Sequence, residues 1–159
     1  MPLYQSSGVP DTVRETVFTT ANVVFGSDAA WKAYTDVELD LPAAVGDQVE
    51  LHVAGMWANA GGGNDFIEWV VVTGAGPTIV RYGSTRTSSP ATQGDPAYYP
   101  NAGFYKGTGP FAFQVAAGDL DGGNVRFAVA HIGAPGGGTL YADSDYPLRL
   151  YAVNKHTVS

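Results

Sequence analysis

The stretch from Trp31 to Leu41 reads Trp-Lys-Ala-Tyr-Thr-Asp-Val-Glu-Leu-Asp-Leu and alternates between two sets of side chains. The first set is mostly apolar and consists of Trp31, Ala33, Thr35, Val37, Leu39 and Leu41. The second set is mostly polar or acidic and consists of Lys32, Tyr34, Asp36, Glu38 and Asp40. Successive side chains of a β-strand point to opposite faces, so the pattern predicts one strand with a buried face and a wet, acidic face.

Segments of the same kind recur along the whole chain. Strands are expected at 15–25, 31–41, 48–54, 66–73, 78–82, 103–106, 110–116, 124–132, 139–142 and 147–153. Turns rich in Gly, Pro and Asp separate them, and no stretch has the periodicity of an amphipathic helix of three turns. Many short strands joined by such turns predict an all-β fold, an antiparallel β-sandwich of the jelly-roll type with eight to ten strands.

The chain has 159 residues, a length typical of one domain. Residues 1–14 are predicted to form an extended N-terminal arm, 15–154 the jelly-roll domain and 155–159 a C-terminal tail. Prolines and glycines prevent a stable helix in the arm, and its apolar residues Leu3, Tyr4 and Val9 are too few to form a core. We expect these three to act as separate anchors when the arm becomes ordered against a neighbouring subunit.

The segment 66–73 is apolar on both faces except at Glu68. This pattern is typical of a central strand or of a strand at a subunit interface. Charged residues make up only 14% of the chain, below the roughly 25% of an average globular protein. Two explanations remain open for this low charge: a surface covered by partner subunits, or a small β protein rich in Gly and Thr.

Composition also limits the classes of partner. The net charge of −7 argues against nucleic acid, whose phosphates require a basic surface. The chain has no cysteine, so disulfides and thiolate metal sites are excluded. The N-terminus lacks the basic start and apolar run of a signal peptide, and no apolar stretch is long enough to span a bilayer. We therefore expect a soluble protein, synthesised in the cytoplasm, with no membrane partner.

Candidate catalytic and metal-binding patterns are weak. The histidines His52, His131 and His156 lie in separate segments, so no two are spaced to bind one metal ion, and we expect structural or surface roles. There is no Gly-x-Ser-x-Gly nucleophile motif, and the Gly-rich runs lack the Lys and the helix of a phosphate loop. The sequence predicts a protein that is not an enzyme and has no cofactor.

Two pairs of carboxylates lie in predicted loops, at Asp119 and Asp121 and at Asp143 and Asp145. Such spacing suits calcium, but the bidentate Glu of an EF-hand is missing, and Asp in a turn commonly caps its own backbone. Capping is the preferred interpretation, and no metal site is predicted.

Aromatic residues gather around the long irregular segment 83–102. Tyr98, Tyr99 and Tyr105 are the candidate partner-binding residues there. Exposed tyrosines on a β scaffold can stack on sugar rings, which would make a carbohydrate-binding surface. Tyrosine is also enriched in packed loops and subunit interfaces, so this second interpretation stays open.

Several ordered motifs give the chain a resemblance to known proteins. They are the opening Val17–Phe25, the stretch Trp31–Leu41, Gly46-Asp-x-Val-x-Leu51, Phe113-x-Val-x-Ala-Gly-Asp-Leu120 and the closing Pro147–Val153. In this order the chain resembles the small β-jelly-roll virion proteins of tailed bacteriophages, over residues 15 to 154. These proteins include capsid decoration or head-fibre proteins and domains of minor tail proteins.

The resemblance implies a non-enzymatic structural component of a virion, located in the particle. It implies a homotrimer that decorates and cements a capsid, with the major capsid protein or another virion protein as partner. The alternative that it implies is a minor tail or fibre module that binds a host-surface glycan or receptor. Fibre modules often follow a collagen-like or coiled-coil stalk, which this sequence lacks, so the decoration role is preferred.

Overall fold

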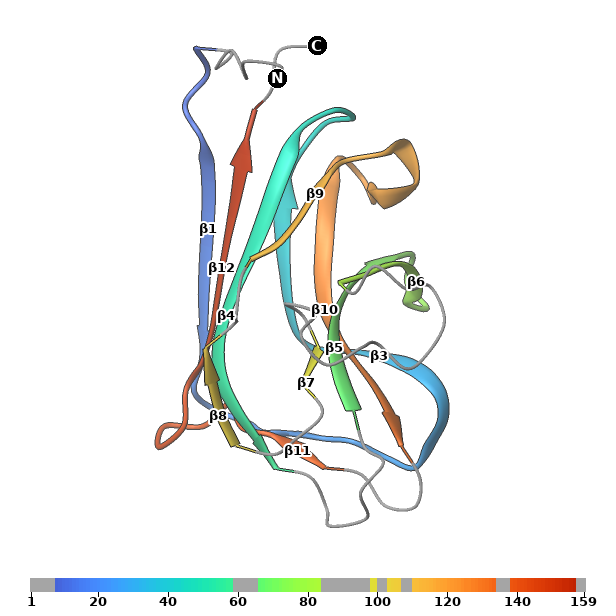
Figure 1. Cartoon of the computed structure of the whole chain (residues 1–159), viewed down its shortest axis with the longest axis vertical. Coiled ribbons are helices and arrows are strands. Elements are labelled where there is room, and N and C mark those ends of the chain that lie inside the picture. Colours follow the sequence, from blue (N-terminus) through green and yellow to red (C-terminus); the bar gives the residue numbers. More distant parts are fainter. Residues whose placement is uncertain are drawn as a thin grey trace.

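Two antiparallel β-sheets pack face to face in the computed structural model of the chain (Figure 1). The structure describes residues 8–58, 66–83, 98–99, 103–106, 110–133 and 138–156. In this part of the chain there are twelve strands and one short 3₁₀ turn, η1, at Ala117–Asp119. Three of the strands span two residues each, which accounts for a count above the expected eight to ten.

The first sheet is built around the long strand β4. It contains β1 (Thr12–Phe18), β2 (Val23–Val24), β4 (Gln48–Ala58), β8 (Gly103–Lys106), β9 (Phe111–Gln114), β11 (Thr139–Leu140) and β12 (Leu148–Lys155). β12 and then β11 pair along one edge of β4, and β9 and β8 pair along its other edge. β1 pairs with β12 and forms the margin of the sheet.

The second sheet has the order β3-β10-β5-β6. Its strands are β3 (Asp28–Pro42), β5 (Phe66–Thr73), β6 (Thr78–Tyr82), β7 (Tyr98–Tyr99) and β10 (Asn124–Gly133). The short strand β7 pairs with the start of β5, on the edge that β6 occupies further along.

The pairing order defines a jelly roll. Eight main strands follow one another in the chain as β1, β3, β4, β5, β6, β9, β10 and β12. The first sheet takes the first, eighth, third and sixth of them, and the second sheet takes the second, seventh, fourth and fifth. This arrangement places two Greek keys in two facing sheets, which is the jelly-roll fold. The predicted fold class is therefore confirmed.

The core lies between the two sheets. Alternate residues of the main strands point into it, including Val37, Leu39 and Leu41 of β3 and Val49, Leu51 and Val53 of β4. Two large aromatic residues, Trp57 and Trp69, are fully buried in the same cluster. Burial of a large apolar side chain contributes about 2–3 kcal/mol, so this layer supplies most of the stability of the sandwich.

The alternation predicted for β3 breaks in its first half. Leu39 pairs with Phe127 and Tyr34 with Val129, so the stretch 34–39 faces only three residues of β10. A bulge of this kind shifts the register and reverses which side chains face the core. Tyr34, expected on the wet face, packs against the main core, whereas Trp31 and Ala33, expected inside, lie on the opposite face of the sheet.

Two other expectations change with the structure. The first strand begins at Thr12, inside the segment expected to be the arm, because its residues pair with 148–154 of β12. The strand 66–73 is β5, which lies inside its sheet between β10 and β6. Its two apolar faces are covered within one chain, so β5 is a core strand and gives no support to a subunit interface.

Candidate functional site

The outer face of the second sheet carries its own small apolar cluster. Val70, Val72, Ala128 and Ala130 of the central strands form its buried floor. Trp31 and Ala33 from β3 and Ile79 and Tyr82 from β6 pack against this floor. Since β3 and β6 are the two margins of the sheet, the sheet curves so that both margins approach over its outer face.

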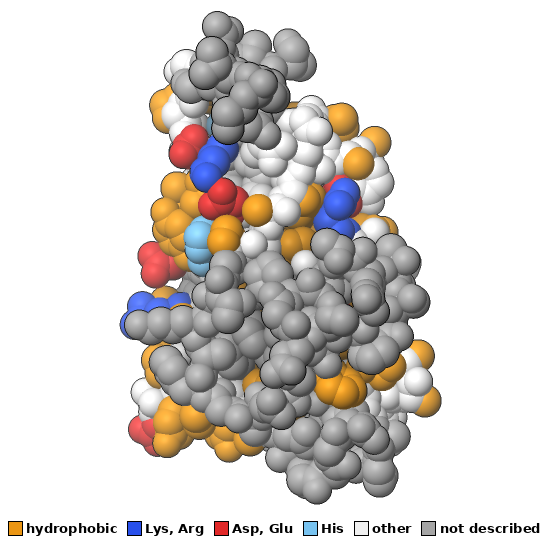
Figure 2. Space-filling model, in the orientation of Figure 1, with side chains coloured by type: hydrophobic (Ala, Val, Ile, Leu, Met, Phe, Trp, Pro, Cys, Tyr) orange, Lys and Arg blue, Asp and Glu red, His pale blue; other side chains and the backbone are white. Residues whose placement is uncertain are grey.

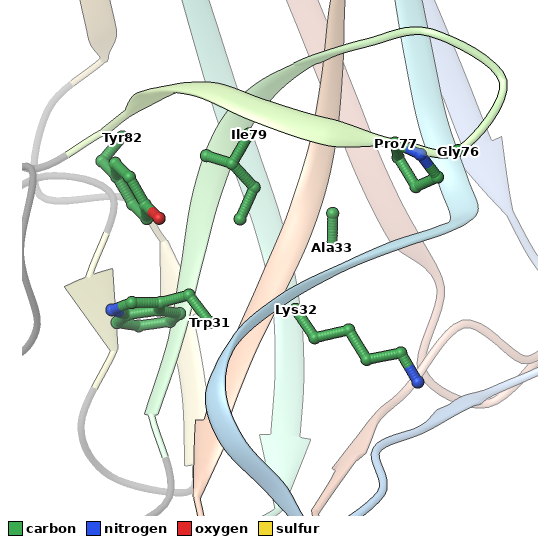
Figure 3. Close-up of a pocket in the computed structure, with 7 residues that line it drawn as sticks. All are labelled: Trp31, Lys32, Ala33, Gly76, Pro77, Ile79 and Tyr82. Carbon is green, nitrogen blue, oxygen red and sulfur yellow. The ribbon is translucent and has the colours of Figure 1, made fainter.

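A pocket of about 480 Å³ lies between these two margins (Figure 3). Its lining residues are Trp31, Lys32, Ala33, Gly76, Pro77, Ile79 and Tyr82. The ring centres of Trp31 and Tyr82 are 6.1 Å apart, and the ring planes meet at 63°. In Figure 3 the Tyr82 ring lies above the Trp31 ring, and Ile79 points toward the same space. Both rings are only half-buried, so each presents aromatic surface to solvent.

Charge is directed away from this pocket or buried beneath it. The Nζ atom of Lys32 lies 4.8 Å from the centre of the Tyr34 ring, on the inner side of β3. Glu68 is buried on the outer face of β5, next to Ala130 in the register. Burial, and then the negative charge of Glu68, raise the pKa of Tyr82, so its hydroxyl stays protonated and available as a hydrogen-bond donor.

A buried polar network has the residue types of a catalytic dyad. His131 Nδ1 lies 2.8 Å from Asp28 Oδ2, and the Tyr34 hydroxyl donates to the same oxygen at 2.7 Å. Burial is the main cause that raises the pKa of Tyr34, which keeps this donor protonated. His131 is fully buried and Phe25 stacks on its ring at 4.7 Å, so the imidazole is shielded from any substrate. The network joins β3 to β10 and is structural.

His156 belongs to a second polar cluster, where the two ends of the domain meet. Its Nε2 lies 2.8 Å from Thr12 Oγ1, and its Nδ1 lies 3.4 Å from Asp47 Oδ2. The same Asp47 oxygen accepts hydrogen bonds from the Asn154 amide and from the backbone N–H of Ala44. Burial alone would raise the pKa of Asp47, but these donors lower it on balance. The cluster fixes the turn before β4 to β1 and β12.

The third histidine lies at the outer surface of the first sheet. His52 Nε2 is 3.2 Å from Glu50 Oε2, and Lys155 Nζ contacts the other oxygen of Glu50. These partners, Lys155 first, lower the pKa of Glu50. The arrangement is a polar cluster at the surface, and the ring centre of Tyr151 lies 5.9 Å from that of His52.

The carboxylates weighed as calcium ligands bind protein donors instead. Asp119 makes a double hydrogen bond to Arg81 at 2.9 and 2.8 Å, and Asp121 binds Arg126 at 2.7 Å. Asp143 accepts from the backbone N–H groups of 145 and 146, as expected of a turn cap. Within the described ranges, no group of three His, Cys, Asp or Glu side chains is placed to hold a metal ion.

Among the partner-binding residues expected from the sequence, the three tyrosines are divided between the two sheets by strand pairing. Tyr98 and Tyr99 form β7 and pair with β5 in the second sheet, whereas Tyr105 lies in β8 and pairs with β4 in the first sheet. Val9 is exposed ahead of β1. Leu3 and Tyr4 lie outside the described residues.

Sequence reasoning missed the Trp31–Tyr82 pocket. It placed Trp31 in the core, and it did not consider that two margins of one sheet meet on its outer face. The sequence contains only a weak indication of this pocket. Ala128 and Ala130 alternate with large residues in β10, and such small side chains leave room above a sheet.

The chain matches no protein-family model and no curated protein. A solved structure that it resembles is that of the infectious bursal disease virus VP2 subviral particle. The two share 10% identity and a TM-score of 0.37, and the match covers 91% of this chain and 37% of that chain. This similarity is too low to identify a relationship. The class defined by the structure itself is a single jelly-roll β-sandwich, and the described part of the chain contains no helix able to cross a membrane.

Proposed function

We propose that the chain is a non-enzymatic structural subunit of a tailed-bacteriophage virion, which forms a homotrimer and decorates the capsid. The observation that carries the proposal is the margin of the first sheet. Among the described strands β1 pairs only with β12, so its other edge offers backbone donors and acceptors to a neighbour.

The side chains around this edge favour association. Val13 and Val17 of β1 are 42% and 37% exposed, and Tyr151 of β12 is 39% exposed. The register places Val13 and Val17 on the same outer face as Tyr151. Figure 2 shows hydrophobic side chains interspersed with charges along the left margin, where β1 and β12 run in Figure 1. Apolar surface with an open strand edge is a typical site for subunit contact.

The chemistry of the polar clusters supports a role without catalysis. His131 is inaccessible in the core, and His52 and His156 are engaged with Glu50 and Asp47. Together with the resemblance to virion jelly rolls, this supports a protein that acts by burying surface between subunits. Each protomer would contribute its β1 margin, and the segment before β1 would extend onto a capsid subunit.

Light scattering after gel filtration tests the assembly. The expected mass is three times the 16.6 kDa of one chain. The double variant Val13→Lys/Val17→Lys should dissociate the trimer, because charged residues on an edge strand oppose pairing. Val45→Lys is the matched control, since Val45 is exposed in the turn between β3 and β4. A monomer at micromolar concentration, or a double variant that stays trimeric, would contradict the proposal.

A further inference from the structure

We propose that the pocket between β3 and β6 is a saccharide-binding site, which takes one neutral pyranose ring stacked on Trp31 and contacted by Tyr82. The inference goes beyond the proposed capsid role, which requires no ligand pocket. It does not depend on that role, because the pocket lies on the second sheet and the proposed subunit contact on the first.

Trp31 differs from the other tryptophans in its exposure to solvent. The other two tryptophans, Trp57 and Trp69, are fully buried in the core, as their large apolar rings favour. The register shift in β3 turns Trp31 to the outer face of the sheet, where it is only half-buried. A tryptophan ring held in this position by the backbone offers a rigid apolar platform, and the apolar face of a sugar ring is complementary to such a platform.

Open space lies in front of the Trp31 ring. The neighbouring residues are small: Ala33 lines the pocket, and Ala128 and Ala130 lie in the floor beneath it. A volume of about 480 Å³ falls within the roughly 300–1,000 Å³ of ligand pockets. A larger side chain at Ala33 would project into this space, so the small residue there helps to keep it open.

The arrangement of the two aromatic rings limits the shape of the ligand. The rings of Trp31 and Tyr82 meet edge to face at 6.1 Å, so the two rings are in contact and leave no slot between them. Proline-rich peptides insert their rings into grooves between aromatic side chains. Here the exposed surface is a corner made of one ring face, a second ring and the Ile79 side chain, which suits a flat ring laid against it (Figure 3).

The charges around the pocket favour a ligand without a negative charge. Lys32 is the charged residue in the lining, and its ammonium group lies against Tyr34 on the other side of β3. The protonated Tyr82 hydroxyl and the Trp31 indole N–H are uncharged polar groups of the lining residues. Hydroxyl groups of a neutral sugar match these groups, whereas an anionic ligand would be disfavoured by the negative charge of Glu68 beneath the pocket.

Acrylamide quenching of tryptophan fluorescence tests the site directly. Since Trp57 and Trp69 are buried, quenching reports mainly on Trp31. The probes are glucose, galactose and N-acetylglucosamine, together with cello- and chito-oligosaccharides. We expect at least one of them to protect Trp31 with a Kd on the order of 1 mM, as befits a single ring on an open site.

Variants assign the binding to the pocket, with saturation-transfer NMR of the sugar as the readout. Trp31→Ala should weaken binding about tenfold or more, and Trp31→Phe should weaken it less because an aromatic platform remains. Tyr146→Ala is the matched control, since it removes an exposed aromatic ring from the connection between β11 and β12 and should leave binding unchanged. Near-ultraviolet circular dichroism verifies that each variant is folded.

Three results would overturn the inference. They are protection of Trp31 by none of these sugars, sugar binding that survives Trp31→Ala, and protection by a decaproline peptide but by no sugar. None of them bears on the trimer or on capsid attachment, so failure here is distinct from failure of the proposed function.

Discussion

Individual polar residues hold the connections of this sandwich in place. Asp119 is buried at the end of η1, where it binds Arg81 of β6 through both oxygens and accepts the backbone N–H of Ala116. The Arg81 guanidinium also lies 4.4 Å from the centre of the Phe113 ring in β9. One arginine therefore ties the margin of the second sheet to the first.

Replacement of Asp119 by Ala should destabilise the protein by about 2 kcal/mol. The change removes a double hydrogen bond and leaves the Arg81 charge and one backbone donor unpaired, although solvent reaches part of Arg81 and reduces the cost. Asp36→Ala, at an exposed position of β3, should change stability by less than about 0.5 kcal/mol. Urea unfolding measures the free energy of unfolding of both variants, and equal losses would contradict the stabilising role of the Asp119–Arg81 pair.

Asp47 makes stability depend on pH in the acid range. Its folded-state pKa lies below the ordinary 3.8, so the carboxylate contributes stability that is complete above that value and is lost as the pH falls through the lower folded pKa. Wild type should therefore lose more stability between pH 5 and pH 2 than Asp47→Asn. The variant itself should be weaker at neutral pH, because Asn lacks the charge that binds Asn154 and His156. Urea unfolding across this range provides the test, and parallel profiles would exclude the role of Asp47.

At the scale of the element, the alternating pattern of β3 correctly predicts the buried face of one half of the strand and not of the other. From Val37 to Leu41 the alternation places side chains in the core as expected. Toward Trp31 it fails, because the bulge opposite Phe127 and Val129 depends on pairing with β10, which is far away in the sequence. No local pattern contains that information.

A pair of substitutions within β3 separates its two halves. Leu39→Ala should cost about 3 kcal/mol, since it opens a cavity in the main core. Trp31→Ala should cost roughly 1–1.5 kcal/mol despite the larger truncation, because the ring is half-exposed on the outer face. The free energies of unfolding in urea compare the two variants. A larger loss for Trp31→Ala than for Leu39→Ala would indicate that Trp31 lies in the core.

Strand positions and the jelly-roll class were predictable because they follow from local alternation and turn residues. The ten expected segments all contain strands, and β5 and β6 have the expected bounds. The pocket was not predictable, since Trp31, Pro77 and Tyr82 meet only through the curvature of a sheet. The assignment of Tyr98 and Tyr105 to different sheets was not predictable either, because it depends on pairing with β5 and β4, which are distant in sequence.

At the scale of the whole molecule, two surfaces have separate proposed tasks. The first sheet ends in an open β1 edge, and the second sheet carries the aromatic pocket. The pairing of β1 with β12, together with the contact between Thr12 and His156, fixes the start of the domain. Residues 8–11 precede this pairing in the described part of the chain.

Removal of residues 1–7 should leave the fold and the thermal unfolding temperature unchanged, because the deletion keeps all of β1. It should reduce attachment to a capsid, since Leu3 and Tyr4 are the proposed anchors there. Val9→Ser in the full chain provides a milder variant at an exposed position. Calorimetry measures the first expectation and capsid binding the second. Full attachment by the truncated chain would show that residues 1–7 have no role in attachment.

Capsid binding tests the central claim most directly. Purified protein is mixed with expanded capsids of the tailed phage to which the proposal assigns it, assembled without the protein, and the capsids are sedimented. The account predicts saturable co-sedimentation, in a whole number of trimers per capsid, which Val13→Lys/Val17→Lys abolishes and Val45→Lys preserves. Protein that remains in the supernatant at every concentration would contradict the assignment as a capsid decoration subunit.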